Sequence, residues 1–437
     1  MKGVNNKFAT MSLSKDIQEL VESDIISQDT ADKIQMYYQS KKGPSQNRLF
    51  VVFGILGAIL VGLGIFLILA HNWDNFSKFT KTILAFVPLI TGQILCGFTL
   101  MKKRDNITWR ESGTAFLFFA VGASISLISQ IYNIPGDLSS FLLTWMLVCF
   151  PLSYLMKSSI ASLLFITGIT YYAVEASYWS HPTSDSYNYW ILLLLTLPYY
   201  YLLYKKNPEA NFMIIHNWLI PLSVIITLGI LAQNAKELMY IAYISLFGFF
   251  YLIGNSTVFK EKKLINNGYR VLGSIGTISL LLALSFDWFW NKLRKQDFQF
   301  NEIIRSPELI AVVILSLLAF GLLYMQRRKK PFVDIDPIEL IFILFIITFI
   351  IGLYSPLSIV LVNLLVFLIG LMTILKGAKL DHLGVLNFGL IIITALVVCR
   401  FFDTDLSFVT RGILFVSVGI GFFVTNFWML KKRKANE

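Results

Sequence analysis

Residues 338–375, IELIFILFIITFIIGLYSPLSIVLVNLLVFLIGLMTIL, decide the fold class of this chain. Glu339 is the only charged residue in the stretch, which is long enough for two helices that each cross a hydrocarbon core about 30 Å thick. Tyr354, Ser355 and Pro356 separate the two runs. They predict either a turn between two membrane spans or a kink within one re-entrant element.

Apolar runs of the same kind recur along the whole chain. The runs lie near 49–70, 79–101, 113–131, 138–156, 158–174, 189–204, 212–232, 238–254, 269–287, 308–325, 338–353, 357–375, 384–402 and 409–430. Only 14% of all residues are charged, about half the fraction expected of a soluble domain. The sequence therefore predicts an all-α polytopic integral membrane protein with about fourteen transmembrane helices, twelve or thirteen being the alternatives.

The distribution of basic residues predicts the orientation of these spans. Alternate connections on one side hold 28 of the 37 Lys and Arg residues. The positive-inside rule then places that side, with both termini, in the cytoplasm. The net charge of +11 is spread over many short loops, which suits membrane topology better than a nucleic-acid-binding surface, so nucleic acid is not expected as a partner.

Sequence composition divides the chain into five segments. They are a disordered start (1–11), a cytosolic helical pair with its linker (12–48), the first four spans (49–156), ten further spans (157–430) and a basic cytoplasmic tail (431–437). Ser14 and Ser27 are the predicted caps of the two cytosolic helices. This pair is too small for a core of its own, so residues 12–40 are expected to bind a protein partner or a second copy of the chain.

Two short polar motifs are expected at the outer face, AHNWD at 70–74 and QIYNIPGD at 130–137. If their side chains converge, they form a polar pocket for a substrate; the candidates are His71, Asn72, Asp74, Gln130 and Asp137. The simpler interpretation is that the aromatic residues form an interfacial belt and the polar residues cap helix ends in water.

A second candidate site lies near the end of the chain. Arg400, Asp403 and Arg411 stand between the last two spans and suit an anionic headgroup or a sugar phosphate. The alternative is that the arginines extend to the interface and are neutralised by the adjacent carboxylates. The connection 287–306, which contains Trp288 and Trp290, is expected to lie as an amphipathic element on the outer surface.

Catalytic and cofactor motifs are missing from the sequence. It contains no phosphate-binding GxxxxGKS loop, no HExxH and no CxxC pair, and its three cysteines lie inside apolar runs. No metal or cofactor is therefore expected, and an enzyme is the less favoured class. His216 is interpreted as a hydrogen-bonding residue. Asn363 and Asn387 are expected to form hydrogen bonds between helices.

The N-terminal third carries a family resemblance. The helical pair, the glycine-rich run 49–70, AHNWD and QIYNIPGD together resemble the bacterial predicted-membrane-protein family catalogued as domain of unknown function 2157. The resemblance covers residues 12–156, and AHNWD is its most specific part. It implies a multi-pass protein of the bacterial inner (cytoplasmic) membrane and supplies no reaction or substrate.

Three functions remain open at this point. Many spans, short loops and few charges inside the spans favour a carrier or flippase-like protein for a lipid-linked or amphipathic substrate, with membrane lipids as partners. The alternative is a non-transport scaffold, sensor or assembly factor that acts through residues 12–40. The third is an intramembrane transferase with His71 and Asp74 as its acid–base pair.

Overall fold

In the computed structural model, the described residues are 17, 20–23, 25–40, 73–179, 187–259, 262–295, 303–328, 336–402 and part of 407–427. The chain forms two compact units, Met1–Lys81 and Thr82–Glu437. The predicted disordered start, the first span at 49–70 and the basic tail lie outside the described residues.

The first unit contains α2 (Gln28–Ser40), the second of the two predicted cytosolic helices. Ser27 caps this helix as the sequence predicts, because its hydroxyl accepts a hydrogen bond from the Thr30 amide at 3.4 Å. The 3₁₀ turn η1 (Trp73–Asn75) belongs to the same unit and contains the AHNWD tryptophan.

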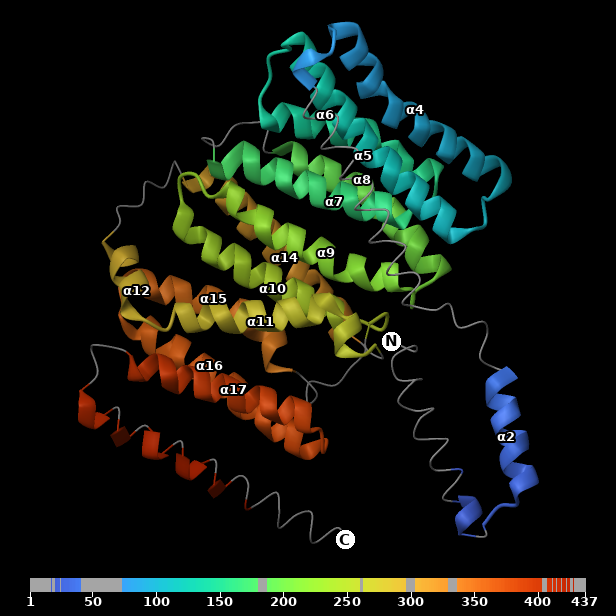
Figure 1. The fold of residues 1–437 in the computed structure, drawn as a ribbon. Coiled ribbons are helices and arrows are strands. Elements are labelled where there is room, and N and C mark those ends of the chain that lie inside the picture. Colours follow the sequence, from blue (N-terminus) through green and yellow to red (C-terminus); the bar gives the residue numbers. More distant parts are fainter. Residues whose placement is uncertain are drawn as a thin grey trace. The chain divides into compact units, whose positions relative to one another are not determined.

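The second unit is built from helices that lie side by side, as Figure 1 shows. The helices are α4 (Lys78–Lys102), α5 (Ile107–Tyr132), α6 (Leu138–Leu155), α7 (Ser159–Val174), α8 (Asn188–Lys206), α9 (Asn211–Leu228), α10 (Met239–Gly254), α11 (Gly268–Ala283), α12 (Asp287–Arg294), α14 (Pro307–Arg327), α15 (Pro337–Tyr354), α16 (Leu357–Lys379) and α17 (Leu383–Phe401). Two short 3₁₀ turns, η4 (Gly229–Leu231) and η5 (Lys236–Leu238), connect α9 to α10.

Ten helices in the described ranges are long and apolar enough to cross a membrane, or eleven if α11 and α12 form one bent span. They confirm the all-α membrane fold class. The helices α15 and α16 are two separate candidate spans, and Ser355 and Pro356 connect them. The helix α8 falls outside the ten, because its tyrosines and terminal lysines lower its hydropathy.

Local capping explains where several helices begin. The side chains of Asn106, Ser158 and Ser306 accept hydrogen bonds from amides in the first turns of α5, α7 and α14 at 3.2 Å. Proline is the first residue of α14 and of α15, where its missing amide hydrogen has no helical partner to lose. Side-chain caps and prolines thus set these boundaries from the local sequence.

A sharp break follows α11, where the chain turns by 71° into the short helix α12. The expectation of a surface element at 287–306 is wrong for Trp290, which is fully buried and donates a hydrogen bond to the Leu284 carbonyl oxygen at 2.8 Å. Trp288 remains exposed. The helix α12 is therefore amphipathic, but its apolar face packs against the protein, mainly α15 and α16.

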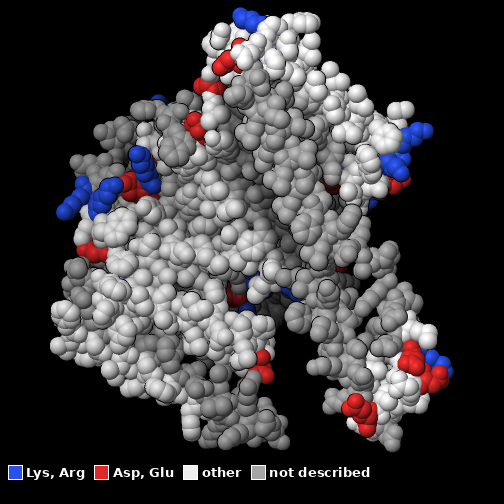
Figure 2. Space-filling view, viewed as in Figure 1, with Lys and Arg blue, Asp and Glu red and all other residues white. Residues whose placement is uncertain are grey.

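Basic connections that alternate along the sequence meet at one end of the second unit, called the basic end below. One cleft at this end is lined by Arg104 after α4, Lys157 after α6 and Lys206 at the end of α8. On the face in Figure 2, the described charged side chains of this unit concentrate toward its two ends, with a broad uncharged band between them. Such a band is what a helix bundle inside a bilayer requires.

Candidate functional site: a lateral groove between α8, α9 and α14

The structure places Asp137 at a helix start. Its carboxylate accepts hydrogen bonds from the Ser140 amide at 2.8 Å and from the Ser140 hydroxyl at 2.5 Å. The Ser139 hydroxyl donates a third bond at 3.1 Å. Hydrogen bonds to the ionised form, those from Ser140 above all, lower the pKa of Asp137 below its ordinary value. Asp137 therefore caps α6, as the simpler interpretation of the QIYNIPGD motif predicts.

The other residues of the two outer motifs are placed only in part. Gln130 lies exposed in the last turn of α5, and Asp74 lies exposed in η1 of the first unit. His71 and Asn72 lie outside the described residues, as do Asp403 and Arg411 of the second candidate site. The convergence of these residues into one pocket stays a prediction.

Arg400 lies at the break between α11 and α12. Its guanidinium donates to the Ser285 hydroxyl at 3.1 Å and lies 4.6 Å from the centre of the Phe286 ring. The Asn363 amide on α16 donates to the Ser285 carbonyl oxygen at 3.0 Å. Arg400 thus helps hold α17 to this break, a contact that the sequence did not predict, and Asn363 holds α16 to it.

The other polar residues of the spans also bond between or within helices. His216 is fully buried, and its two ring nitrogens lie 2.7 Å from the Phe212 carbonyl oxygen and 3.0 Å from the Ser162 hydroxyl. Both ring nitrogens are therefore occupied, which agrees with the hydrogen-bonding role inferred for His216. Asn387, by contrast, is exposed on α17, so its predicted bond to a neighbouring helix stays a prediction.

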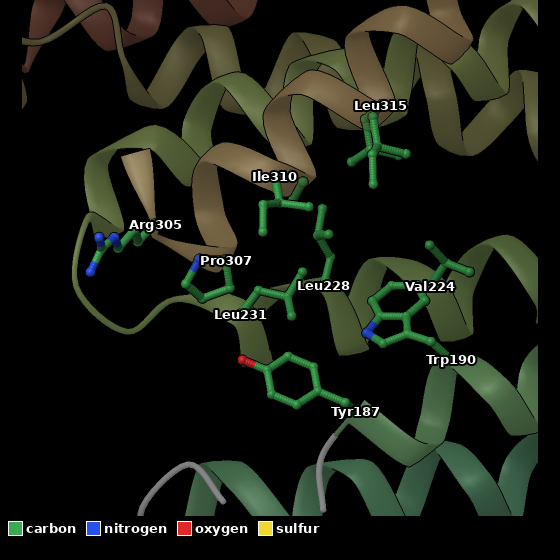
Figure 3. A pocket seen from close by; sticks show the side chains of 11 residues that line it. Tyr187, Trp190, Val224, Leu228, Leu231, Arg305, Pro307, Ile310 and Leu315 are labelled. Atoms are coloured by element: carbon green, nitrogen blue, oxygen red, sulfur yellow. The ribbon is translucent and has the colours of Figure 1, made fainter. Parts of the chain in front are cut away.

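A groove of about 460 Å³ lies between α8, α9 and α14, and Figure 3 shows it from close by. Its lining is almost entirely apolar and comes from three stretches that are far apart in the sequence: Tyr187, Trp190, Val224, Leu228, Leu231, Arg305, Pro307, Ile310, Ala311, Ile314 and Leu315. Its volume is in the range of sites that hold a small ligand or part of a lipid.

The groove opens sideways through the exposed flank of α14. Ile310 and Ile314 line it and are 55% and 51% exposed, so a bilayer lipid has direct access. Ala311 forms part of the buried wall. The groove is therefore open along the α14 side.

Polar groups stand at one end of the groove. Arg305 lies at this end and Leu315 at the other, and the Arg305 guanidinium points away from the apolar side chains (Figure 3). The Tyr187 hydroxyl accepts a hydrogen bond from the Gln233 side-chain amide at 3.2 Å. The groove thus combines an apolar wall with a cation at its rim, the pattern that an acyl or polyprenyl chain with an anionic head requires.

The described residues include no group of three or more His, Cys, Asp or Glu side chains able to hold a metal ion. The groove residues could not be recognised from the sequence, because each is an ordinary interfacial residue by itself. An aromatic residue at the start of α8 and an arginine before α14 were the available signals. Only the packing of three helices makes them one site.

Comparison with known proteins identifies one region of the chain. Residues 18–162 match the family DUF2157, described as a predicted membrane protein. The DUF2157 match confirms the resemblance seen in the N-terminal third and supports the membrane assignment. It ends within α7, so the lateral groove lies beyond it. No curated protein and no solved structure matches the chain.

Proposed function

We propose that this chain is a carrier in a bacterial inner membrane, with both termini in the cytoplasm, for a lipid-linked or otherwise amphipathic anion. The observation that carries the proposal is the groove between α8, α9 and α14, which is open to the bilayer side and has Arg305 at its rim. In this orientation the groove lies toward the outer leaflet, because the basic end faces the cytoplasm.

The chemistry of the groove indicates how a substrate is selected. An acyl chain gains little when it leaves the bilayer for an apolar protein surface, because lipid tails are as apolar as leucine. Selectivity must therefore come from the headgroup. Arg305 is the basic residue at the groove, so an anionic headgroup is favoured over a zwitterionic one.

Lipid translocation in proteoliposomes tests the proposal. The chain is reconstituted with trace amounts of NBD-labelled phosphatidylglycerol, phosphatidylethanolamine or polyprenyl phosphate, and the label accessible to dithionite is followed over time. The wild-type chain should move at least one anionic lipid faster than empty liposomes do. Equal rates with and without protein for all three lipids would contradict the carrier function.

Matched variants tie any flux to the groove. Ile310→Trp fills the groove, whereas Ile347→Trp places the same bulk on α15 at an isoleucine of similar exposure, 52% against 55%. Flux should fall in the first variant and persist in the second. Arg305→Gln should slow the anionic lipid more than phosphatidylethanolamine, and the exposed Lys295→Gln should not discriminate.

A scaffold is the second candidate, and the paired interior of α7, α8 and α9 favours it. The Ser223 hydroxyl lies 2.6 Å from both the Thr170 and the Tyr189 hydroxyls, and Ser159 lies 3.0 Å from the Tyr199 hydroxyl. Such pairing suits a rigid bundle. Deletion of residues 12–40 separates the candidates: a carrier keeps its flux in liposomes, whereas a scaffold loses complementation of a deletion strain.

A further inference from the structure

A polar cleft of about 360 Å³ opens at the basic end of the second unit. It lies where the connection after α4, the connection after α6 and the end of α8 meet, and it is lined by Thr99, Leu100, Arg104, Asp105, Arg110, Leu155, Met156, Lys157 and Lys206. A neighbouring hollow of about 350 Å³ shares Arg110, Lys157 and Lys206 with it. The two hollows therefore adjoin each other at these three basic residues.

Positive charge dominates this cleft. Its lining contains four basic side chains, Arg104, Arg110, Lys157 and Lys206, against the single carboxylate of Asp105. Lys205 adds a further cation in the neighbouring hollow. Like charges gathered around a partly enclosed space repel one another, and an anion in that space removes the repulsion.

The position of Arg110 is fixed by its neighbour. An Arg110 Nη atom donates to the Glu111 carboxylate at 3.4 Å. That carboxylate is buried and also accepts bonds from the Ser158 hydroxyl at 2.5 Å and the Ile160 amide at 2.9 Å. The Nε atom of Arg110 is buried and has no hydrogen-bond partner among the described residues. The Arg110 side chain as a whole is 20% exposed and lines both hollows, so its guanidinium borders the cleft.

Lys157 occupies a backbone position that favours glycine. Its φ is 51°, in the left-handed region, directly after the end of α6. Glycine is the usual residue at such a helix end, because a Cβ atom strains the left-handed backbone. A lysine in place of glycine at this strained position favours a role for its positive charge in the cleft.

We propose that this cleft binds a phosphate group, carried either by a phospholipid or by a soluble phosphorylated molecule. Arginine and lysine side chains that approach from separate connections match the several oxygens of a tetrahedral oxyanion. The neighbouring hollow has Leu202 and Leu203 among its lining residues and accommodates an apolar substituent of the phosphate. The site lies at the opposite end of α8 from the lateral groove and is independent of the carrier function.

Binding to the purified full-length chain tests the proposal. The probes are inorganic phosphate, followed by ³¹P NMR line broadening, and phosphatidylglycerol, counted by native mass spectrometry. Lipid retained in the presence of excess inorganic phosphate identifies a phospholipid site. Binding of inorganic phosphate that also displaces the lipid identifies a soluble ligand. Failure of both probes to bind overturns the proposal.

Lys157→Gly separates binding from folding. The variant removes one cation and relieves the left-handed strain, so its thermal stability should equal or exceed that of the wild type. Its affinity for the bound probe should fall about tenfold, the usual effect of losing one charged hydrogen bond. Lys103→Gly is the matched control, because Lys103 is exposed in the same connection as Arg104 and lines neither hollow. Equal loss of affinity in both variants would also overturn the proposal.

Discussion

The carboxylate of Glu111 on α5 accepts a hydrogen bond of 2.5 Å from the hydroxyl of Ser158, the residue that caps α7. Glu111 also accepts bonds from the amides of Ser159 at 3.2 Å and Ile160 at 2.9 Å. The first amides of a helix have no partner within the helix, so an anion from a neighbouring helix is well placed there. This contact fixes the start of α7 against α5.

Glu111→Ala should destabilise the second unit strongly. The variant leaves a buried hydroxyl and two amides without their acceptor and removes the partner of Arg110. Breaking such a buried charged network costs about 3–5 kcal/mol. Thermal unfolding in detergent measures the loss, with the exposed Glu209→Ala as control. Indistinguishable melting of the two variants would show that the contact contributes nothing.

Gly352→Ala should destabilise the contact between α12 and α15. A Cβ atom at Gly352 would clash with the Trp290 ring, which is fully buried. Overpacking of this kind costs about 1–3 kcal/mol. Gly321→Ala is the matched control, since a Cβ atom there meets nothing within 4 Å and should be neutral or stabilising. Unfolding of both variants at the wild-type temperature would refute the tight contact.

The start of α6 should depend on pH through Asp137. Because its folded-state pKa is lowered, its contribution is present above the unfolded value of about 3.9 and is lost as pH falls through the folded value. Asp137→Asn keeps a capping side chain without a titrating group, so it should remove this pH dependence. Amide-exchange protection of residues 138–142, followed as a function of pH, measures the stability of the start of α6. If acid lowered this protection equally in the wild type and in Asp137→Asn, the pH dependence would belong to another titrating group.

The membrane orientation makes a direct labelling prediction. Gly136→Cys lies in the connection after α5, where a Cβ atom meets nothing within 4 Å, and Lys103→Cys lies in the connection after α4. With Cys399 replaced by alanine, an impermeant maleimide should label position 136 on intact cells and position 103 only after the membrane is opened. The reverse pattern would invert the topology.

The helices were predictable from the sequence because apolar length and loop charge are local properties. The predicted runs 357–375 and 384–402 correspond closely to α16 and α17. The doubtful break at 354–356 proved to be a plain turn, while the bend occurs after α11. The role of Asp137 as a helix cap could also be predicted, because a cap acts within its own turn.

Contacts between distant segments were not predictable. Trp290 has the sequence context of an interfacial aromatic residue, yet it packs against Gly352 on another helix. Glu111 reaches amides more than forty residues away. The lateral groove joins residues of α8, α9 and α14, whose periodicity reveals which faces are apolar but not which faces meet.

Photo-cross-linking tests most directly whether the lateral groove selects its lipid. Benzoylphenylalanine is placed at Tyr187, where it replaces an aromatic ring that already lines the groove, or at the exposed Tyr171 on α7, and lipids cross-linked in cells are identified by mass spectrometry. The groove position should capture one anionic class far above its abundance in the membrane, and Arg305→Gln should abolish that enrichment. The same lipid profile at both positions, matching the bulk membrane, would contradict a selective groove.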